Sequence, residues 1–335
     1  MRFVPDNFFL FEEKKLKLFV LKKVFSFIIT FISVISIIFF ISRAIGDPFQ
    51  TFMDDPRVTE DVVARIKMKF GLDKPLGVQY LNFLISTFKG DFGYSLLFHR
   101  PVFKIIFLRL PWTLFLLGTS TIISTIISYY LGVWLAWKRG SKLDVYGTNF
   151  FMFIRSTPHF WLGMVFLLLF GYYYSIFPLY GALTPGAVYK NQLEKLVDII
   201  FHSILPSGVL IIRKIGTTLL YIRNASLDVI KENFVNTAIA KGLTERRIVY
   251  HHVARNSMLP MVTITALQFG SLVDGAILTE TVFSYPGTGK LIYEAILNND
   301  YFLIQGAFFM IALCVLSANL IADLIYMKLD PRVKL

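Results

Sequence analysis

The chain carries no charged residue between Leu110 and Trp137. A helix of about 20 apolar residues crosses the hydrocarbon core of a bilayer, so this stretch is long enough to span a membrane with some tilt. The whole chain has the same character, because 55% of its residues are hydrophobic and only 17% are charged. Soluble domains are about one quarter charged. The sequence therefore predicts an all-α polytopic membrane protein.

Apolar runs predict about six transmembrane helices, over residues 24–44, 109–137, 145–176, 201–222, 258–283 and 301–327. Lys22 and Lys23 before the first run would also suit a signal peptide, but no small-residue cleavage site follows it. We therefore expect an uncleaved first helix over 23–44, after a cytoplasmic N-terminal extension over 1–22. An extracytoplasmic segment over 45–108 and a core over 109–335 follow. The core holds the other five helices and a cytoplasmic loop over 223–257.

Basic residues predict the orientation of these spans. They concentrate in 1–23, 138–142, 223–256 and 328–334, whereas the alternate short loops hold only Lys190, Lys195 and Lys290. Because basic loops stay on the cytoplasmic side, both termini and the 223–257 loop are predicted to be cytoplasmic. The net charge of +12 belongs to this pattern, so nucleic-acid binding is not expected.

Two segments outside the spans carry weaker signals. Val62, Val63, Ile66 and Phe70 recur at helical spacing, which predicts a surface helix over Glu60–Phe70 in the extracytoplasmic segment, ended by Gly71 and Pro75. The extension of about 20 residues before the first span is predicted to lie on the membrane surface or to be disordered.

The loop from Glu232 to Pro260 is charged and helix-forming, although apolar spans flank it on both sides. A short helix is predicted to end at Ala240-Lys241, with Gly242 as a left-handed cap and Thr244 as the N-cap of a second, basic helix. Two short helices that meet at an angle present a knob. We expect a docking surface for another protein, and the alternative is an amphipathic loop lying on the membrane.

The sequence contains no motif that favours an enzyme. PGTGKL at 286–291 lacks the spacing and the Ser or Thr of a phosphate-binding loop, and Pro286, Gly287 and Gly289 are interpreted as a turn after span five. Adjacent His251 and His252 point about 100° apart on a helix and have no partner motif, so no metal site is expected.

Polar residues inside spans are costly in hydrocarbon and often face a cavity. Asp274 and Glu280 qualify, and Ser156 and Pro158 lie where proline is expected to break span three. These four residues are our candidates for a translocation path. The alternative for Glu280, and also for Arg213 and Lys214, is a side chain that snorkels to the membrane surface.

The charged loop resembles the EAA loop of ABC importer permeases, whose hallmark is an alanine pair, a glycine and a downstream Ile/Leu-Pro. Residues 237–243 (TAIAKGL) and Leu259-Pro260 occupy these places. Five further blocks look like the dipeptide/oligopeptide-type permease, the first of two paired permease subunits, and the resemblance covers about residues 21–335. They are FGLDKPLGVQYLNFLISTFKGDFGYSL (70–96), STPHFWLG (156–163), HHVARNSMLP (251–260), ETVFSYPGTGKL (280–291) and DLIYMKLDPRVKL (323–335).

The resemblance implies a type I ABC importer permease fold in the cytoplasmic (inner) membrane, with a helical extracytoplasmic segment between spans one and two. It implies as partners a second homologous permease, two cytoplasmic ATPases and an extracytoplasmic solute-binding protein. ATP and magnesium would be bound by the ATPases, and this chain would hold no cofactor and no catalytic residue. The loop residues expected to couple to the ATPase are Glu232, Thr237, Ala238, Ala240, Lys241, Gly242, Leu243, Arg246, Arg247, Asn256 and Pro260.

The chain departs from the family at two positions. Ile239 stands where arginine is common, and Asp274 where a small residue is usual, so Asp274 is expected to touch the solute path or a cation. The solute stays open among dipeptides, longer peptides, nickel complexes, glutathione and oligosaccharides. A competing function is an ion-gradient-driven carrier that works without an ATPase, with Asp274 and Glu280 as ion sites.

Overall fold

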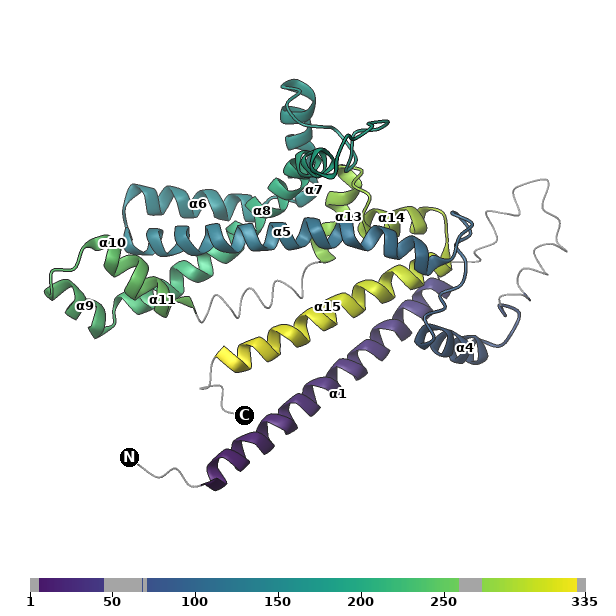
Figure 1. Cartoon of the computed structure of the whole chain (residues 1–335), viewed down its shortest axis with the longest axis horizontal. Helices are drawn as coiled ribbons and strands as arrows, with labels where there is room; N and C mark the ends of the chain where they lie inside the picture. The colour runs from purple at the N-terminus through teal and green to yellow at the C-terminus, as the bar shows by residue number, and fades with distance from the viewer. Residues whose placement is uncertain (1–5, 45–67, 69–70, 259–272, 330–335) are drawn as a thin grey trace. The chain divides into compact units, whose positions relative to one another are not determined.

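A computed structural model gives the architecture of the chain (Figure 1). It describes all residues except 1–5, 45–67, 69–70, 259–272 and 330–335. The described residues form helices joined by turns and loops, with one isolated bridge between Tyr94 and Pro101 and no longer strand among them. The predicted all-α class is confirmed.

The chain forms two compact units. The first joins residues up to Pro111 with Gly287–Ser317, and the second joins Trp112–Pro286 with Ala318–Lys334. The described helices of the first unit are α1 (Asp6–Ala44), α4 (Leu76–Phe88), α14 (Thr288–Leu297), the start of α5 (Val102–Trp137) and the start of α15 (Tyr301–Leu329).

The second unit contains the rest of α5, the rest of α15 and a series of shorter elements that accompany the long helix α8. The described helices that lie wholly within it are α6 (Lys142–Ser156), α7 (His159–Phe166), the π-helical η1 (Leu167–Tyr173), α8 (Gln192–Ile230), α9 (Asn233–Ala240), α10 (Glu245–Arg247), the π-helical η2 (Ile248–Val253), α11 (Ala254–Asn256) and α13 (Val273–Val282).

Within the described residues, four helices are long and apolar enough to cross a membrane: Val20–Arg43, Val102–Trp137, Gln192–Ile230 and Tyr301–Ile321. They coincide with four of the predicted spans. The predicted span 258–283 lies partly outside the described residues, where only its end is seen as α13. The predicted number of six therefore stays a prediction.

Predicted span three is a bent pair, because Lys142–Ser156 and His159–Tyr173 meet at 103°. Thr157 takes an extended backbone with ψ 134°, and Pro158 begins α7 as its N-cap. The residue before a proline is pushed out of the helical region, so the break follows from the Thr-Pro pair itself. The expected bend at Pro158 is confirmed.

Two other details differ from the sequence predictions. Residues from Asp6 continue the helix of the first span without a break, so this part of the extension is helical, and its expected place on the membrane surface stays a prediction. Gly289 lies buried inside α14, and the turn after α13 falls earlier, at Phe283-Ser284, where Ser284 has a φ of +47°. The expected helix over 60–70 falls outside the described residues, apart from Met68.

Glycines allow the helices of the second unit to pack closely. A Cβ added at Gly216 of α8 would lie 2.6 Å from the carbonyl oxygen of Phe151 in α6. One added at Gly132 of α5 would lie 3.0 Å from the carbonyl oxygen of Leu219 in α8. Small residues at such contacts are typical of membrane helices, which gain by close backbone packing rather than by expelling water.

Candidate functional site

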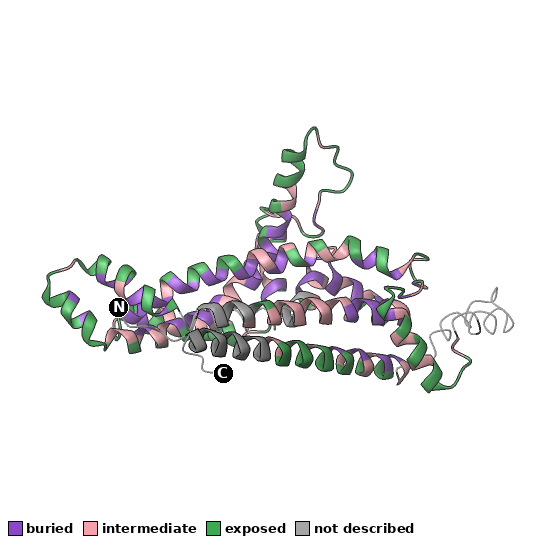
Figure 2. Ribbon diagram, turned by 60° about the horizontal axis from the view of Figure 1, so that its bottom comes forward, coloured by how far each residue is buried: buried purple, intermediate pink, exposed green. Residues whose placement is uncertain are grey.

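The candidate site is the loop of residues 231–258, which we call the knob loop (α9–α11). It follows the end of α8 at Ile230 and begins with Glu232 as the N-cap of α9. The α9 helix is short, and after a turn the chain continues through α10, η2 and α11. In Figure 1 these elements form one end of the second unit, and Figure 2 shows many exposed residues along them.

Gly242 ends α9 as predicted. Its φ is +70°, its N–H donates to the Ile239 carbonyl at 2.9 Å, and the Leu243 N–H donates to the Ala238 carbonyl at 3.3 Å. These two bonds define a Schellman motif, which satisfies carbonyls that the helix end leaves without partners. An added Cβ at Gly242 would meet no heavy atom within 4 Å. The glycine is therefore required by its backbone conformation, and the space beside it within this chain is open.

The second helix starts where it was predicted to start. Thr244 takes the extended N-cap conformation, and its carbonyl accepts from the N–H of Arg247 at 2.9 Å and of Ile248 at 3.1 Å. Its side chain makes no capping hydrogen bond. Thr244 therefore caps by backbone geometry alone, and the polar contact of this turn comes from the next residue.

Glu245 fastens the knob loop to the end of α5. Its Oε1 accepts hydrogen bonds from Trp137 Nε1 at 2.7 Å and from Lys138 Nζ at 2.6 Å. The hydrogen bond from Lys138, then the one from Trp137, lower the pKa of the Glu245 carboxyl below its ordinary value. The contact is exposed, so it orients the start of α10 more than it adds stability.

An apolar cluster lies under the knob loop. Val235 and Ala238 of α9 pack with Leu243 after the turn, and with residues of α5, α8 and the second half of the loop. The other buried members are Tyr129, Val133, Ile222, Ile248, Val249, Val253 and Ala254. Both halves of the knob loop, α9 and the η2–α11 segment, therefore pack on α5 and α8. The loop has an ordered apolar core of its own.

The predicted coupling residues divide between the two faces of the loop. Ala238 is buried in the cluster and Leu243 is half-buried, so both support the loop from inside. Pro260 lies outside the described residues. The other predicted residues are exposed: Glu232, Thr237, Ala240, Lys241, Gly242, Arg246, Arg247 and Asn256.

Apolar side chains also stand on the exposed face of the knob loop. Ile239, the residue that departs from the family pattern, is 51% exposed, and Phe234 and Tyr250 are 39% and 41% exposed. Sequence reasoning did not single out Phe234 or Tyr250. A signal for Phe234 was available, because it stands one position before the buried Val235 and so falls off the apolar stripe of α9.

A buried ion pair holds the helices from which the knob loop emerges. Asp144 in the first turn of α6 accepts bonds from Arg223 Nε at 2.6 Å and Arg223 Nη2 at 2.7 Å. The Asp144 carboxylate also accepts a hydrogen bond from the Gly140 N–H, and the backbone N–H of Asp144 donates to Ser141 Oγ. Sequence reasoning missed this pair, because it counted Arg223 only as a topology charge. The Ser141–Asp144 spacing was the available sign of a helix start.

The translocation-path candidates lie in different settings. The hydroxyl of Ser156 donates back to the Met152 carbonyl of its own helix, and Pro158 starts α7. Glu280 of α13 has no exposed surface and accepts a hydrogen bond from Thr113 Oγ1 of α5 at 2.7 Å. The alternative of a snorkelling Glu280 is therefore wrong for this structure. Asp274 lies in α13, but its side chain is outside the described part of the chain.

Lys214, another candidate for snorkelling, is half-buried and also binds inside the protein. Its Nζ donates to Thr121 Oγ1 of α5 at 2.5 Å. Glu280 and Lys214 thus each use a threonine hydroxyl of α5 as their partner. Hydroxyl side chains on a membrane helix commonly bind polar groups of neighbouring helices.

Comparisons with known proteins agree with this architecture. Residues 128–335 match the family described as binding-protein-dependent transport system inner membrane component, and residues 16–117 match its N-terminal membrane component. The oligopeptide transport system permease protein AppB of Bacillus subtilis is 36% identical over 291 residues, which cover 86% of this chain and 90% of the relative.

Two further relatives cover nearly the whole chain. The dipeptide transport system permease protein DppB of Escherichia coli K12 is 32% identical over 334 residues, covering 94% of this chain and 98% of the relative. The di/tripeptide transport system permease protein DppB of Pseudomonas aeruginosa is 32% identical over 330 residues, with the same coverage of both chains.

Proposed function

This chain belongs to the family of binding-protein-dependent transport system inner membrane components, the permeases of ABC importers, and from that premise we propose how it works. It pairs with a second, homologous permease to form a translocation path. An extracytoplasmic solute-binding protein delivers the solute, and two separate cytoplasmic subunits hydrolyse ATP. The energy of that hydrolysis enters this chain through the knob loop.

The observation that carries the proposal is the construction of the knob loop. Its underside is packed and fastened on α5 and α8, while its outer face carries Lys241, Arg246 and Arg247 beside the exposed Ile239. A loop that is rigidly joined to membrane helices transmits a displacement at its tip to those helices. A lipid-lying loop would not require a separate anchor on each of its two arms.

The contact face is mixed in character, as docking surfaces are. Apolar residues at the centre of an interface supply affinity, and the charges around them supply orientation. Phe234 and Ile239 are the apolar centre in this proposal, and Lys241, Arg246 and Arg247 are the rim. An acidic-rimmed groove on the ATPase is the complementary surface.

Short peptides are the proposed solutes. The similar permeases named above serve oligopeptide, dipeptide and di/tripeptide transport systems, and the match extends over almost the whole length of these proteins. Glu280, held in the membrane region by Thr113 of α5, is our candidate for a polar group near the path.

The test uses the open space at Gly242. Asparagine tolerates a positive φ, so Gly242→Asn keeps the turn and adds a side chain where only a partner would meet it. Gly186 is the matched control, because its φ is +75° and its added Cβ also meets nothing within 4 Å. We expect Gly242→Asn to lower ATP-dependent peptide uptake about tenfold or more and to reduce co-purification of the ATPases, the effect of losing about 1.4 kcal/mol of docking. Gly186→Asn should leave both unchanged.

Two outcomes would contradict the proposal. Equal uptake by the two variants would mean that the knob loop does not couple ATP hydrolysis to transport. Peptide accumulation by the purified chain alone, driven by an ion gradient in proteoliposomes without ATPases, would favour the secondary carrier.

A further inference from the structure

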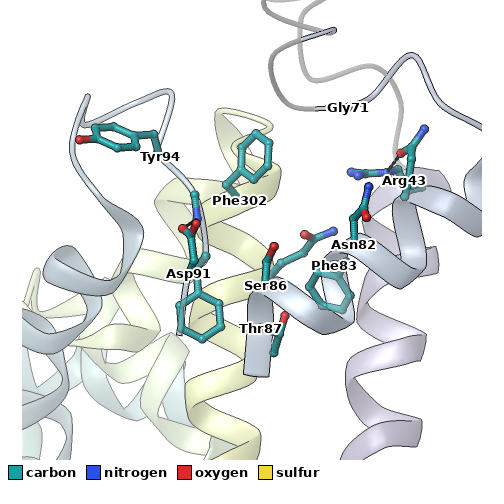
Figure 3. A pocket seen from close by; sticks show the side chains of 13 residues that line it. Arg43, Gly71, Asn82, Phe83, Ser86, Thr87, Asp91, Tyr94 and Phe302 are labelled. Carbon is teal, nitrogen blue, oxygen red and sulfur yellow. Dashed lines mark hydrogen bonds between the residues drawn. The ribbon is translucent and has the colours of Figure 1, made fainter. Parts of the chain in front are cut away.

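A polar cavity of about 380 Å³ lies in the first compact unit, between the end of α1, the helix α4 and the start of α15 (Figure 3). Polar side chains on its wall include Arg43, Asn82, Ser86, Asp91 and Gln305, and Phe302 adds an aromatic side. Its size is in the range that proteins use for small ligands. None of its wall residues belongs to the knob loop or to the translocation-path candidates described above.

Arg43 is held in place at one side of the cavity. Its Nε donates to Gln79 Oε1 at 3.0 Å. The Gln79 amide nitrogen donates to the carbonyls of Lys74 and Leu72, which turns the Gln79 oxygen toward Arg43. The guanidinium lies 4.9 Å from the Phe39 ring centre and 5.5 Å from that of Tyr301. The cation is therefore oriented before any ligand arrives.

One nitrogen of the same guanidinium is not used as a hydrogen-bond donor within the described part of the chain. Its Nη1 is buried and has no hydrogen-bond partner among the described residues. A buried donor without a partner is costly, and the cost is larger when the group is charged. An arginine fork in this state is suited to a carboxylate or a phosphate, which accept two parallel bonds.

Asp91 is placed on the cavity wall by the end of α4. Gly90 has a φ of +74°, its N–H donates to the Thr87 carbonyl at 3.0 Å, and the Asp91 N–H donates to the Ser86 carbonyl at 2.9 Å. One oxygen of the Asp91 carboxylate accepts from the Gly93 N–H at 3.0 Å. Its other oxygen takes part in no hydrogen bond among the described residues, and the side chain is exposed.

Figure 3 shows Arg43 and Asp91 on opposite sides of the cavity, with Asn82 and Ser86 between them. A fixed cation at one side and a fixed carboxylate at the other repel ligands that carry a single type of charge at both ends. The amide and hydroxyl groups between them suit a polar linker.

We propose that this cavity binds a small zwitterion, with its anionic group at Arg43 and its ammonium group at Asp91. Two sources supply this chemistry: a free short peptide with unblocked termini, and the headgroup of an aminophospholipid. The ammonium must carry N–H donors in either case, because Asp91 recognises it by hydrogen bonding.

The experiment uses the full chain in phosphatidylcholine nanodiscs, with dialanine, N-acetyl-dialanine and dialanine amide as probes in a calorimetric titration. The wild-type chain should bind dialanine about tenfold more tightly than either blocked form, the effect of one charge-assisted hydrogen-bonded contact. In Arg43→Gln the amide should bind as well as dialanine, while the acetyl form stays weak. In Asp91→Asn this pattern should be reversed.

Lys89→Gln is the matched control, because Lys89 is an exposed cation two residues from Asp91 and does not line the cavity. It should retain the wild-type discrimination against both blocked forms. Asp91→Asn changes an exposed side chain, so this variant should stay folded. Its binding can therefore be measured even if Arg43→Gln weakens the contact between α1 and α4.

A second arm identifies the source. If the natural ligand is the lipid headgroup, phosphatidylethanolamine in the nanodisc should displace dialanine. The lipid should then also remain bound in native mass spectra of the wild type but not of Asp91→Asn. Unchanged dialanine binding in that lipid assigns the cavity to a free zwitterion. Binding of both ligand types that is insensitive to both substitutions, or no binding of either, overturns the proposal.

Discussion

The ends of α4 and α9 are built in the same way in two different units of the molecule. Each helix stops at a Lys-Gly pair, Lys89-Gly90 and Lys241-Gly242, with the glycine at a φ of +74° and +70°. Each makes the two reverse hydrogen bonds of the Schellman motif. In both places an added Cβ would find open space within 4 Å. Conformation, and not crowding, demands both glycines.

The two ends differ in the residue after the glycine. Leu243 packs into the apolar cluster under the knob loop, whereas Asp91 stays exposed on a cavity wall. One backbone motif therefore serves two purposes. An apolar residue after the glycine anchors the turn and leaves the helix face for contact outside the chain. A charged residue there places a carboxylate at a fixed point.

The two regions also use different partners for a buried carboxylate. Asp144, near the knob loop, faces the guanidinium of Arg223 at 2.6 Å. Asp300, in the unit that holds α4, is fully buried and accepts from Ser95 Oγ at 2.5 Å and from the N–H groups of Leu97 and Leu303. The first depends on charge, and the second on neutral donors.

The largest expected loss of stability comes from neutralising one of the two buried carboxylates, and the loss should differ between Asp144 and Asp300. Asp144→Asn leaves Arg223 without a counter-charge in a mostly buried site, and we expect a loss of about 3–5 kcal/mol in the free energy of unfolding. Asp300→Asn keeps its shape and strands no cation, so we expect about 1–3 kcal/mol. Unfolding in mixed micelles by increasing SDS fraction measures both. Equal losses would mean that charge pairing does not distinguish the two regions.

The local parts of this comparison could be predicted from the sequence. Gly242 is recognisable as a left-handed cap because a helix-forming run ends there and a new one begins, and Gly90 also directly follows the end of a helix-forming run. The apolar stretch 109–137 and the break at Pro158 follow in the same way from composition and from proline geometry. Each of these signals lies within a few consecutive residues.

The long-range contacts could not be predicted. Asp144 meets Arg223 from 79 positions away, Glu245 meets Lys138 from 107, and Glu280 meets Thr113 from 167. No local pattern marks the partner of a polar side chain, because the fold that brings the two together is set by helix packing. Ala238 illustrates the same limit, since the family motif does not say which of its two alanines faces inward.

Exchanging the residues after the two glycines should have the second largest effect. Leu243→Asp removes apolar contact and brings a carboxylate against the cluster of Val235 and Ala238, with an expected loss of about 2 kcal/mol. Asp91→Leu changes an exposed position, and we expect less than about 0.5 kcal/mol. The same SDS titration compares them. Similar losses for the two exchanges would show that Leu243 does not anchor its turn.

Alanine at the two glycines should give a smaller and equal effect. Gly242→Ala and Gly90→Ala each force a Cβ into the left-handed region without any clash, which costs about 1–2 kcal/mol. The two losses should agree within about 0.5 kcal/mol, since the backbones match and the sites are independent. A clearly larger loss at one site would indicate a contact that the open space around both glycines does not suggest.

The smallest effect concerns Glu245, which lies just beyond the turn at the end of α9 and binds Trp137 and Lys138. Since these bonds lower the pKa of Glu245 in the folded chain, its contribution to stability is complete above the ordinary pKa of a glutamate. That contribution is lost as pH falls through the lowered folded value. Glu245→Gln should therefore reduce the thermal unfolding midpoint slightly at pH 7. The difference from wild type should shrink in the acid range below pH 4.5, the ordinary pKa of this group.

Glu232→Gln is the control for this titration, because Glu232 is exposed in the same loop and its side chain makes no capping bond. It should leave the unfolding midpoint unchanged at both pH values, which separates the contact of Glu245 from a general effect of one fewer acidic group in a basic loop. A difference between wild type and Glu245→Gln that persists unchanged into acid would mean that the carboxylate charge does not fasten the knob loop to α5.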